Sequence, residues 1–585
     1  KHVTESTSGQ EDIQKTWWKE AIIYQIYPRS FQDSDGDGIG DLNGITSRLD
    51  YIQSLGVDII WLNPIFLSPN DDNGYDISDY REIMREFGTM EDFDRLLKEI
   101  HKREMRLVLD LVVNHTSDEH PWFEEARKSR HNPYYNYYHW WPAEKGEPPL
   151  RLSYFDEEGN AWMYNKSTDS YYLHYFSRKQ PDLNWENPEV RQEIFDMMRF
   201  WFDKGIDGFR MDSISLIAKD PSFPLIDSKK YPDIFSFYAK EPRLHLYLHE
   251  MNRQVLSKYD CMSVGEGSAV MVDDVAKFVD PAREELNMLY HFDAARIRNT
   301  TLPDNPESGI DYSLIALKKM FTEWDKAVDK GWPSIYLGNH DQPRMVSRFG
   351  SDKDEFRALS AKMLITFLLT MRGTPYWFAG DEIGMRNIRF DRIEDYNDID
   401  TINRYKKAKA EGKDPQAVLD EQKETGRDNA RTPFQWDRSP ETGFTAGTPW
   451  LKVNPDYTWI NVADEEKDPT SILNYFKKVV SFRKENPSLI YGSYHLLDAE
   501  NPQSYTFLRK TGADTYLIML NFSPKAAIST PGIDMSNAHV LLDNYGDRSH
   551  MAPQKDITLR PFEAIVFQLN HPVYESFIDS LDLLE

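Results

Sequence analysis

Short apolar segments alternate along most of this chain with longer segments in which apolar residues recur at helical spacing, as in 90–103 and 190–204. The apolar segments are short enough to be buried strands. They comprise residues 21–28, 57–64, 105–115, 205–212, 261–266, 289–293, 333–340 and 374–379. Strand alternating with helix eight times predicts an α/β fold, the (β/α)8 TIM barrel.

Two long segments interrupt the alternation. Residues 116–185 lie after the third predicted strand and are rich in Tyr, Trp and Phe, so we expect an inserted domain B over the C-terminal rim of the barrel. Residues 387–426 are charged with a helical pattern, which predicts a subdomain. The barrel should then comprise 17–115 and 186–490.

The pattern changes again towards the C-terminus. Alternating strands at 504–508, 515–521 and 564–568 predict an antiparallel β-sandwich domain over 491–572. Residues 1–16 are polar and are expected to form a disordered N-terminal segment. The apolar stripe in the C-terminal tail, 573–585, is expected to dock on the protein's own surface.

The net charge of -27 argues against nucleic acid, anionic substrates and membrane surfaces as partners. No apolar run is long enough to span a membrane. The single cysteine, Cys261, excludes an intrachain disulfide and a cysteine-based metal site, and we expect it in the core. The first residue is Lys1 rather than Met, which suggests processing or trimming. The compartment stays open between cytoplasm and periplasm, and the oligomeric state between monomer and homodimer.

Three predicted strands end on a carboxylate: Asp212, Glu266 and Asp341. The carboxyl ends of barrel strands meet at one rim, so these acids are expected to converge together with Arg210 and His340. Cleavage of a bond between sugars needs one carboxylate to attack and one carboxylic acid to protonate the leaving oxygen. The pattern therefore predicts glycoside hydrolysis.

Neighbouring residues predict how the three acids differ. Arg210 shares a strand face with Asp212 and is expected to keep it ionised as a nucleophile. Glu266 ends an apolar strand beside glycines and is expected to stay protonated as a general acid. Asp341 can hold ring hydroxyls and oppose ionisation of Glu266.

Other polar residues near predicted strand ends are candidates for binding. His115 can hydrogen-bond a sugar hydroxyl, and Asp110 is expected to orient Arg210 or His115. Tyr75 could stack on a sugar ring while Asp76 holds its hydroxyls. A metal site built from His115 and His340 is conceivable, although no ligand spacing supports it.

Alternating acids and glycines near the N-terminus predict a cation site. Oxygen-only ligands at this spacing suit Ca²⁺, or Mg²⁺, in a structural role, the alternative being a solvated acidic turn. The candidate ligands are Asp33, Asp35, Asp37, the carbonyl of Ile39, and Asp41.

Four strings in this order, 110–115, 208–212, 264–266 and 339–341, resemble the four signature regions of the α-amylase superfamily, glycoside hydrolase family 13. Residues 180–184 and 427–436, with the aspartate loop, resemble its branch of oligo-1,6-glucosidases, α-glucosidases and sucrose isomerases. The resemblance covers about residues 17 to 570.

The resemblance implies a barrel with domain B and a C-terminal β-domain. It implies Asp212 as nucleophile, Glu266 as acid/base and Asp341 as transition-state stabiliser, in a pocket closed at one end. It also implies Ca²⁺ in the aspartate loop. The residues that would surround the non-reducing glucose are Asp76, Tyr75, His115, Phe176, Arg210, His340 and Arg427.

Three positions depart from the pattern of the branch. Ser213 follows the nucleophile where α-1,6-specific relatives often carry Val and α-1,4-active ones Thr, so α-1,4 or mixed activity is favoured. Gly267-Ser268 stands where sucrose isomerases tend to place an aromatic residue, which favours hydrolysis. The string Arg389–Arg392 loosely resembles the isomerase loop and keeps isomerisation open.

The sequence therefore predicts a retaining exo-α-glucosidase that releases α-glucose from short α-glucosides with α-1,4 or mixed α-1,4/α-1,6 linkages, with sucrose as a further candidate. One alternative is a sucrose isomerase or transglucosidase that makes isomaltulose or trehalulose. Another is a non-catalytic relative such as an amino-acid-transporter heavy chain.

Overall fold

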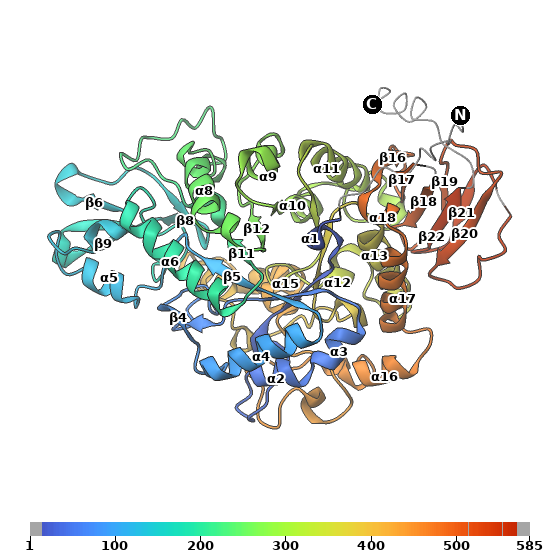
Figure 1. The fold of residues 1–585 in the computed structure, drawn as a ribbon, viewed down its shortest axis with the longest axis horizontal. Coiled ribbons are helices and arrows are strands. Elements are labelled where there is room, and N and C mark those ends of the chain that lie inside the picture. Colours follow the sequence, from blue (N-terminus) through green and yellow to red (C-terminus); the bar gives the residue numbers. More distant parts are fainter. Residues whose placement is uncertain (1–14, 513, 553, 570–585) are drawn as a thin grey trace, which may run out of the picture.

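The computed structural model describes residues 15–569 apart from 513 and 553 (Figure 1). The predicted N-terminal segment 1–16 therefore falls almost wholly outside the described residues, and the tail 573–585 falls wholly outside them. None of the helices in the described ranges combines the length and the apolar character needed to cross a membrane.

The predicted TIM barrel is confirmed. Its eight parallel strands form one sheet in the order β13-β12-β11-β5-β2-β1-β15-β14. Ser334 Oγ of the last strand donates to the carbonyl of Leu289 in the first at 2.9 Å, which joins the two edges into a nearly closed barrel. The strands are β1 (Ile23–Ile26), β2 (Ile59–Leu62), β5 (Arg106–Val112), β11 (Gly208–Asp212), β12 (Met262–Glu266), β13 (Met288–Tyr290), β14 (Ser334–Ile335) and β15 (Thr374–Phe378).

The seventh strand is shorter than its apolar run predicts. Only Ser334 and Ile335 pair with β15, where Ile335 lies opposite Pro375. Pro375 has no N–H to donate, which limits the ladder at this point. The chain beyond is free to bend, and it carries Asn339 to Asp341 onto the barrel rim.

Helices surround the barrel and set the position of its strands. Helix α6 runs directly into β11, where a Cβ on Gly208 would lie 2.2 Å from the carbonyl oxygen of Met262 in β12. Only glycine therefore allows this close approach of β11 to β12. The main helices are α4 (Met90–Lys102), α6 (Pro188–Lys204), α8 (Arg243–Gln254), α11 (Leu314–Ala327), α13 (Arg357–Thr370) and α17 (Ile472–Glu485).

Large side chains fill the barrel interior beneath the C-terminal rim. Trp61, Tyr290 and Tyr376 belong to one buried cluster with aliphatic residues of the neighbouring strands. The Arg210 guanidinium lies 5.1 Å from the Trp61 ring centroid and 5.4 Å from that of Tyr290. The barrel is thus closed below Arg210, and any ligand must approach from the rim.

Domain B, the segment between β5 and α6, forms a separate layer on one side of the barrel rim (Figure 1). Bridges at His115–Asp182 and Tyr138–Leu183 connect its two ends to the barrel loop. Its elements are α5 (Pro121–Ala126), a three-stranded antiparallel sheet of β6 (Trp140–Pro142), β10 (Ser170–Leu173) and β9 (Trp162–Asn165), and the pair β7 (Leu152–Ser153) and β8 (Asp156–Asn160).

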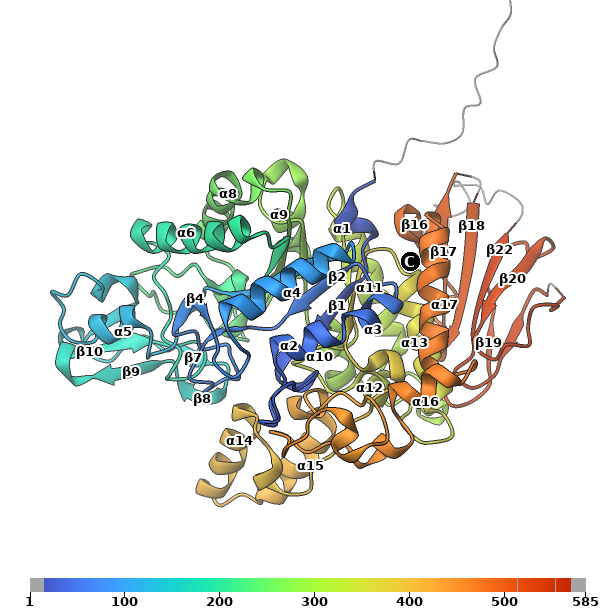
Figure 2. The same ribbon diagram turned by 60° about the horizontal axis from the view of Figure 1, so that its bottom comes forward.

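The predicted charged subdomain contains α14 (Ile399–Ala410) and α15 (Pro415–Thr425), which form a lobe beside β7 and β8 (Figure 2). The C-terminal region has a five-stranded antiparallel sheet in the order β16-β17-β18-β22-β20 and a two-stranded sheet, β19-β21. One apolar cluster holds Leu508 and Leu517 of the larger sheet and Ile557 of the smaller, so the two sheets pack as a sandwich. These strands are β16 (Ser493–Leu497), β17 (Ser504–Thr511), β18 (Asp514–Asn521), β19 (Ala527–Ser529), β20 (Ala538–Asp543), β21 (Ile557–Leu559) and β22 (Ala564–Leu569).

A buried arginine joins the barrel to the C-terminal sheet. Arg509 of β17 is fully buried, and its guanidinium donates to backbone carbonyls rather than to an acid. Burial lowers the pKa of Arg509, and nearby Arg483 and Arg372 lower it further. The acceptors are the carbonyl oxygens of Thr370 (2.7 Å), Leu489 (2.6 Å), Ile490 (3.2 Å), Gly492 (2.8 Å) and Ser493 (3.2 Å).

We predict that Arg509→Met lowers the free energy of unfolding by about 3 kcal/mol, because several buried carbonyls lose their donor. Thermal unfolding followed by circular dichroism measures the change. The exposed Arg438→Met is the matched control and should stay within about 0.5 kcal/mol of the wild type. Equal loss in the two variants would contradict the role given to Arg509.

Candidate active site

The three predicted acids meet in one pocket. Asp212, Glu266 and Asp341 all line a cavity of about 300 Å³ at the C-terminal rim of the barrel. Asp212 ends β11, Glu266 ends β12, and Asp341 lies in the loop after β14. The cavity is at the small end of ligand pockets and suits a single sugar ring better than a chain.

Arg210 holds these acids together. Its Nη1 donates to Asp110 Oδ1 at 2.9 Å and to Asp212 Oδ1 at 3.0 Å. Its Nη2 donates to Glu266 Oε2, and its Nε donates to the Tyr290 hydroxyl at 2.7 Å. The expectation that Asp110 orients Arg210 is met. One guanidinium therefore sets the positions of both Asp212 and Glu266.

The charge state of Asp212 differs from the sequence-based expectation. Burial raises the pKa of Asp212 well above its ordinary value, the negative charge of Glu266 raises it further, and Arg210 acts in the opposite direction. Arg210 alone therefore does not keep Asp212 ionised, because it is shared among three carboxylates.

Asp341 is in the opposite electrostatic situation. Burial acts to raise its pKa, but His340, Arg427 and Arg431 outweigh that effect and hold the pKa well below the usual range. Arg427 Nη1 and Arg431 Nη2 lie 3.3 and 3.4 Å from Asp341 Oδ1. Asp341 is therefore a permanent negative charge on the pocket wall.

The neighbours of His340 fix which ring nitrogen carries the proton. Nδ1 lies 2.8 Å from Gln25 Nε2 and 3.2 Å from Asn63 Nδ2, both of which are donors. Nδ1 therefore accepts, so Nε2 carries the proton, and it lies 3.2 Å from Asp341 Oδ2. The Tyr75 ring stacks on His340 with centroids 5.3 Å apart. His340 is thus a fixed, neutral hydrogen-bond donor at the pocket.

Tyr75 and His115 both line the pocket, but their polar atoms already have protein partners. The Tyr75 hydroxyl donates to Asp110 Oδ2 at 2.6 Å, and His115 Nε2 donates to the Tyr75 carbonyl at 2.9 Å. Burial lowers the pKa of His115 to about 3, so the ring is neutral. Phe176 lies against His115 with ring centroids 5.1 Å apart. These residues form an apolar, rigid wall.

Asp76 is not at the pocket, which corrects the sequence-based prediction. Its carboxylate is fully buried and accepts from Ser68 Oγ at 3.0 Å and from the backbone N–H groups of Asp71 and Asp72 at 2.8 and 3.0 Å. It organises the loop instead of meeting a ligand. The side chain that lines the pocket is Asp72, whose pKa burial raises to about 6 against the opposing charge of Arg427.

Arg427 contacts three acidic side chains at one wall of the pocket. Its Nη2 lies 2.6 Å from Asp398 Oδ1 and 3.4 Å from Asp72 Oδ1, while Nη1 reaches Asp341. The guanidinium also lies 5.3 Å from the Phe155 ring centroid. Because Asp398 is fully buried, it acts as the anchor that holds Arg427 in place.

Residues Arg389–Arg392, which resemble an isomerase loop, lie outside the catalytic pocket. Arg389 pairs with Asp352 at 2.7 Å and Glu424 at 3.0 Å, and Phe390 is buried in a cluster with Tyr396. None of Arg389–Arg392 lines the pocket of the acids. The similarity of this string to an isomerase loop therefore carries no argument about catalysis.

Two serines contact the other oxygen of Glu266. Ser268 Oγ donates to Oε1 at 2.8 Å, and Ser213 Oγ lies 3.4 Å from the same atom. Arg210 holds Oε2, so both oxygens of Glu266 have defined partners. Both serines line the pocket, and neither blocks the space above Glu266 as an aromatic side chain would.

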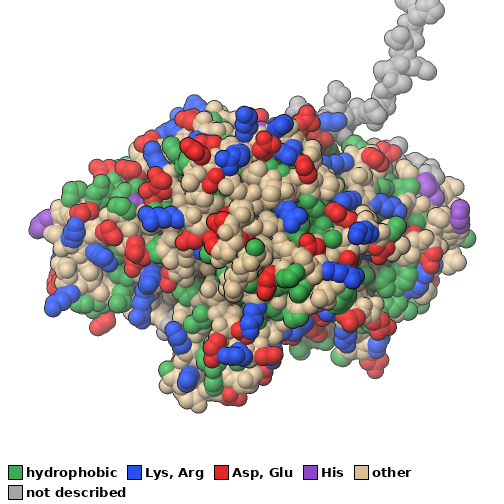
Figure 3. All heavy atoms as spheres, turned by 90° about the horizontal axis from the view of Figure 1, so that it is seen from below, with side chains coloured by type: hydrophobic (Ala, Val, Ile, Leu, Met, Phe, Trp, Pro, Cys, Tyr) green, Lys and Arg blue, Asp and Glu red, His purple; other side chains and the backbone are tan. Residues whose placement is uncertain are grey.

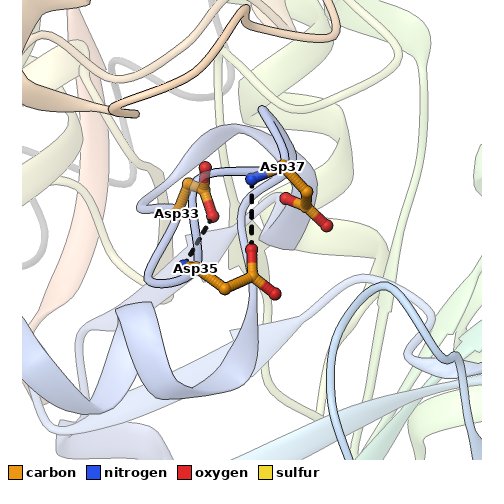
Figure 4. A group of neighbouring side chains, drawn as sticks. All are labelled: Asp33, Asp35 and Asp37. Carbon is orange, nitrogen blue, oxygen red and sulfur yellow. Dashed lines mark hydrogen bonds between the residues drawn. The ribbon is translucent and has the colours of Figure 1, made fainter.

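The predicted cation loop forms (Figure 4). Asp33, Asp35 and Asp37 place one carboxylate oxygen each within 4.8 Å of one another, the single such group among the described residues. Asp41 caps helix α2 (Leu42–Ser47) by accepting from Gly44 N at 2.7 Å. The Ile39 N–H donates to Asp37 at 2.9 Å. Asp41 and the Ile39 carbonyl stay predicted ligands beside the group of three carboxylates.

The loop needs glycine at one point. Gly38 has φ +86°, and a Cβ there would lie 1.8 Å from the carbonyl oxygen of Thr448. Partial desolvation, then the charges of Asp35 and Asp33, raise the pKa of Asp37 to about 6. This crowding of like charge is what a bound divalent cation would relieve, so the three carboxylates fit a hard cation.

Several pocket residues were missed from the sequence. Asp72 lies in the run Asn70–Asn73, where spacing cannot show which acid turns inwards. Asp400 and Arg404 line the pocket from a helix far along the chain. Tyr290, which accepts from Arg210 Nε without lining the pocket, ends a strand that carries no acid. Cys261, which was expected in the core, is half-buried, and burial raises the pKa of its thiol to about 12, which disfavours the thiolate form.

Comparison with known proteins places the site in a family. Residues 25–492 match the catalytic domain of α-amylase. The chain is 51% identical to the oligo-1,6-glucosidase of Parageobacillus thermoglucosidasius, over 96% of this chain and 100% of the relative. It is 49% identical to the oligo-1,6-glucosidase of Bacillus cereus, over 95% and 100%. The trehalulose synthase of Pseudomonas mesoacidophila superposes with a TM-score of 0.89 at 42% identity, covering 95% of this chain and 99% of that one. This chain belongs to the α-amylase family of glycoside hydrolases.

Proposed function

We propose that this glycoside hydrolase is a retaining exo-α-glucosidase that removes α-glucose from the non-reducing ends of short α-glucosides. The observation that carries the proposal is the contact of Arg210 with both Asp212 and Glu266 at the base of a pocket sized for one sugar ring. The oligo-1,6-glucosidase relatives support the substrate class.

In the proposed reaction, Asp212 attacks the anomeric carbon while Glu266 protonates the departing glycosidic oxygen. A covalent glucosyl-enzyme forms, and Glu266 then removes a proton from the water that releases glucose. The step needs Asp212 ionised and Glu266 protonated. Asp341 and His340 face the same pocket and would hold ring hydroxyls as positive charge develops on the sugar.

We predict that Glu266→Gln lowers kcat/KM for maltose by about 10³-fold, because the leaving oxygen loses its proton donor. Hydrolysis of α-glucosyl fluoride should fall far less, since fluoride leaves without a proton, and added azide should restore turnover and give α-glucosyl azide. Steady-state kinetics and product NMR measure both.

Asp212→Asn is the matched control, because it removes the nucleophile and should be inactive on either substrate, with or without azide. Circular dichroism confirms that both variants are folded. Azide rescue of Asp212→Asn and not of Glu266→Gln would reverse the two assignments.

The preferred linkage depends on the space above Glu266. Ser213 lines the pocket and offers a small hydroxyl 3.4 Å from Glu266 Oε1. A small side chain here leaves room for more than one orientation of the leaving sugar, which supports mixed α-1,4 and α-1,6 activity. Transfer to fructose is the second candidate, because a trehalulose synthase shares the fold. Gly267 and Ser268 leave fructose without an aromatic holding group.

We expect glucose from both maltose and isomaltose, and glucose with fructose from sucrose, as measured by chromatography of the products. Ser213→Val should lower the ratio of maltose to isomaltose cleavage roughly tenfold, because methyl groups fill the space and the hydroxyl is lost. Ser213→Thr, which keeps the hydroxyl, should change the ratio less. Isomaltulose or trehalulose as the main product from sucrose would favour the isomerase.

We further propose that Asp33, Asp35 and Asp37 hold a structural Ca²⁺, with Mg²⁺ as an alternative ion. The close approach of three carboxylate oxygens supports this, as does the hydrogen bond of Thr445 Oγ1 to Asp33 Oδ2 at 2.6 Å, which fixes the loop to a distant segment. The ion would neutralise the loop and would not touch the reacting sugar.

We predict that Ca²⁺ raises the melting temperature more at pH 7.5 than at pH 5. The pKa of Asp37, raised to about 6 in the fold, means that the metal-free loop is most stable below about pH 4 and loses stability as pH rises through 6. Differential scanning calorimetry with and without Ca²⁺ measures this. Asp37→Asn should abolish the pH-dependent part, and an equal Ca²⁺ effect at both pH values would contradict the proposal.

A further inference from the structure

A second cavity lies beside the catalytic pocket. We call it the lateral groove. It has a volume of about 900 Å³ and runs between domain B residues 153–179 and the lobe of α14 and α15. Phe155, Phe176 and Arg404 line both the lateral groove and the catalytic pocket, so the two cavities adjoin. A ligand in the groove would therefore lie next to the catalytic pocket.

Basic side chains outnumber acidic ones along the lateral groove. Asp71, Glu411 and Glu421 are its acidic lining residues. In Figure 3 the α14–α15 lobe projects at the lower edge and carries Lys and Arg side chains among acidic ones. The basic lining residues are Arg178, Lys179, Arg404, Lys406, Lys407 and Lys413.

Some of these cations are already neutralised by partners and others are not. Arg404 is held by both oxygens of Asp400 at 3.1 Å, and Lys413 pairs with Glu411 at 3.0 Å. Arg178, Lys179 and Lys406 are exposed, and the ion pairs found in the described part of the chain include none of them. Charges farther apart than about 8 Å are screened at physiological salt, so these local cations outweigh the overall charge of -27.

His174 adds a second, different binding group. Its ring is 3% exposed and lines the lateral groove, and its Nδ1 donates to the Phe176 carbonyl at 2.9 Å. Nε2 is therefore an acceptor, and it is buried without any hydrogen-bond partner. Burial lowers the pKa of His174 to about 4, so the ring stays neutral near pH 7. A buried acceptor of this kind is satisfied by an O–H or N–H donor.

We propose that the lateral groove binds a sugar phosphate, whose phosphate meets Arg178, Lys179 and Lys406 while a hydroxyl group donates to His174 Nε2. A neutral sugar would leave the cations unused, and an anion such as sulfate has no O–H for His174. The ligand is either a free hexose phosphate or the phosphorylated leaving sugar of a glucoside, and the second case rests on the proposed glucosidase function.

Titration calorimetry with glucose 6-phosphate tests the site directly and does not depend on catalysis. The wild type should bind glucose 6-phosphate at least tenfold more tightly than glucose or sulfate, and more weakly as salt rises. The double variant Lys179→Gln/Lys406→Gln should lose at least tenfold in affinity. Lys98→Gln/Lys102→Gln, two exposed lysines of α4, is the matched control and should bind like the wild type. Equal binding of glucose and glucose 6-phosphate, or equal affinity of the two double variants, would overturn the proposal.

Kinetics separate the two sources of the phosphate. A leaving-group role predicts a higher kcat/KM for maltose carrying a 6-phosphate on its reducing glucose than for maltose, and predicts that Lys179→Gln/Lys406→Gln removes the preference. A free-ligand role predicts that glucose 6-phosphate changes the hydrolysis of p-nitrophenyl α-glucoside in the wild type and not in that variant. Absence of both effects would overturn the proposal, whereas inactivity on every glucoside would count against the glucosidase function alone.

Discussion

The buried guanidinium of Arg210 is the constraint on which the site depends. A buried cation at the base of the pocket, beside the rings of Trp61 and Tyr290, is costly unless charged and polar groups surround it. Four side chains from four barrel strands do so: Asp110, Asp212, Glu266 and Tyr290. Asp212 lies on β11, the strand that also carries Arg210. Pairing Arg210 therefore brings the two reacting carboxyls to one point.

The same arrangement divides the three acids into two electrostatic classes. Asp212 and Glu266 share a single guanidinium that also serves Asp110, and the pKa of Asp212 stays well above its ordinary value. Asp341 has Arg427 and Arg431 on one oxygen and His340 on the other, so it stays charged. The number of neighbouring cations thus distinguishes the two roles. Asp212 and Glu266 share one arginine and are suited to the reaction itself, whereas Asp341 has two arginines beside it and is suited to stabilising positive charge.

The barrel and the meeting of its three acids could be predicted from the sequence, because both follow from periodic patterns along the chain. Period-two and period-3.6 patterns give strands and helices, and the carboxyl ends of parallel strands share one rim, so Asp212, Glu266 and Asp341 could be expected to meet. Asp72 and Asp76 could not be told apart, because a loop has no periodicity and only the fold shows that Asp76 accepts the loop's own N–H groups. Arg404 and Asp398 were unpredictable, since the α14–α15 lobe reaches the pocket only in three dimensions.

The central claim is that Asp212 forms a covalent bond to the sugar while Glu266 handles the proton. Mechanism-based trapping tests it most directly: the enzyme is incubated with 5-fluoro-α-glucosyl fluoride, digested, and mapped by peptide mass spectrometry. The sugar ester should be found on the peptide that contains Asp212, at that residue. An ester on Glu266 or Asp341, or continued turnover without any trapped ester, would contradict the claim.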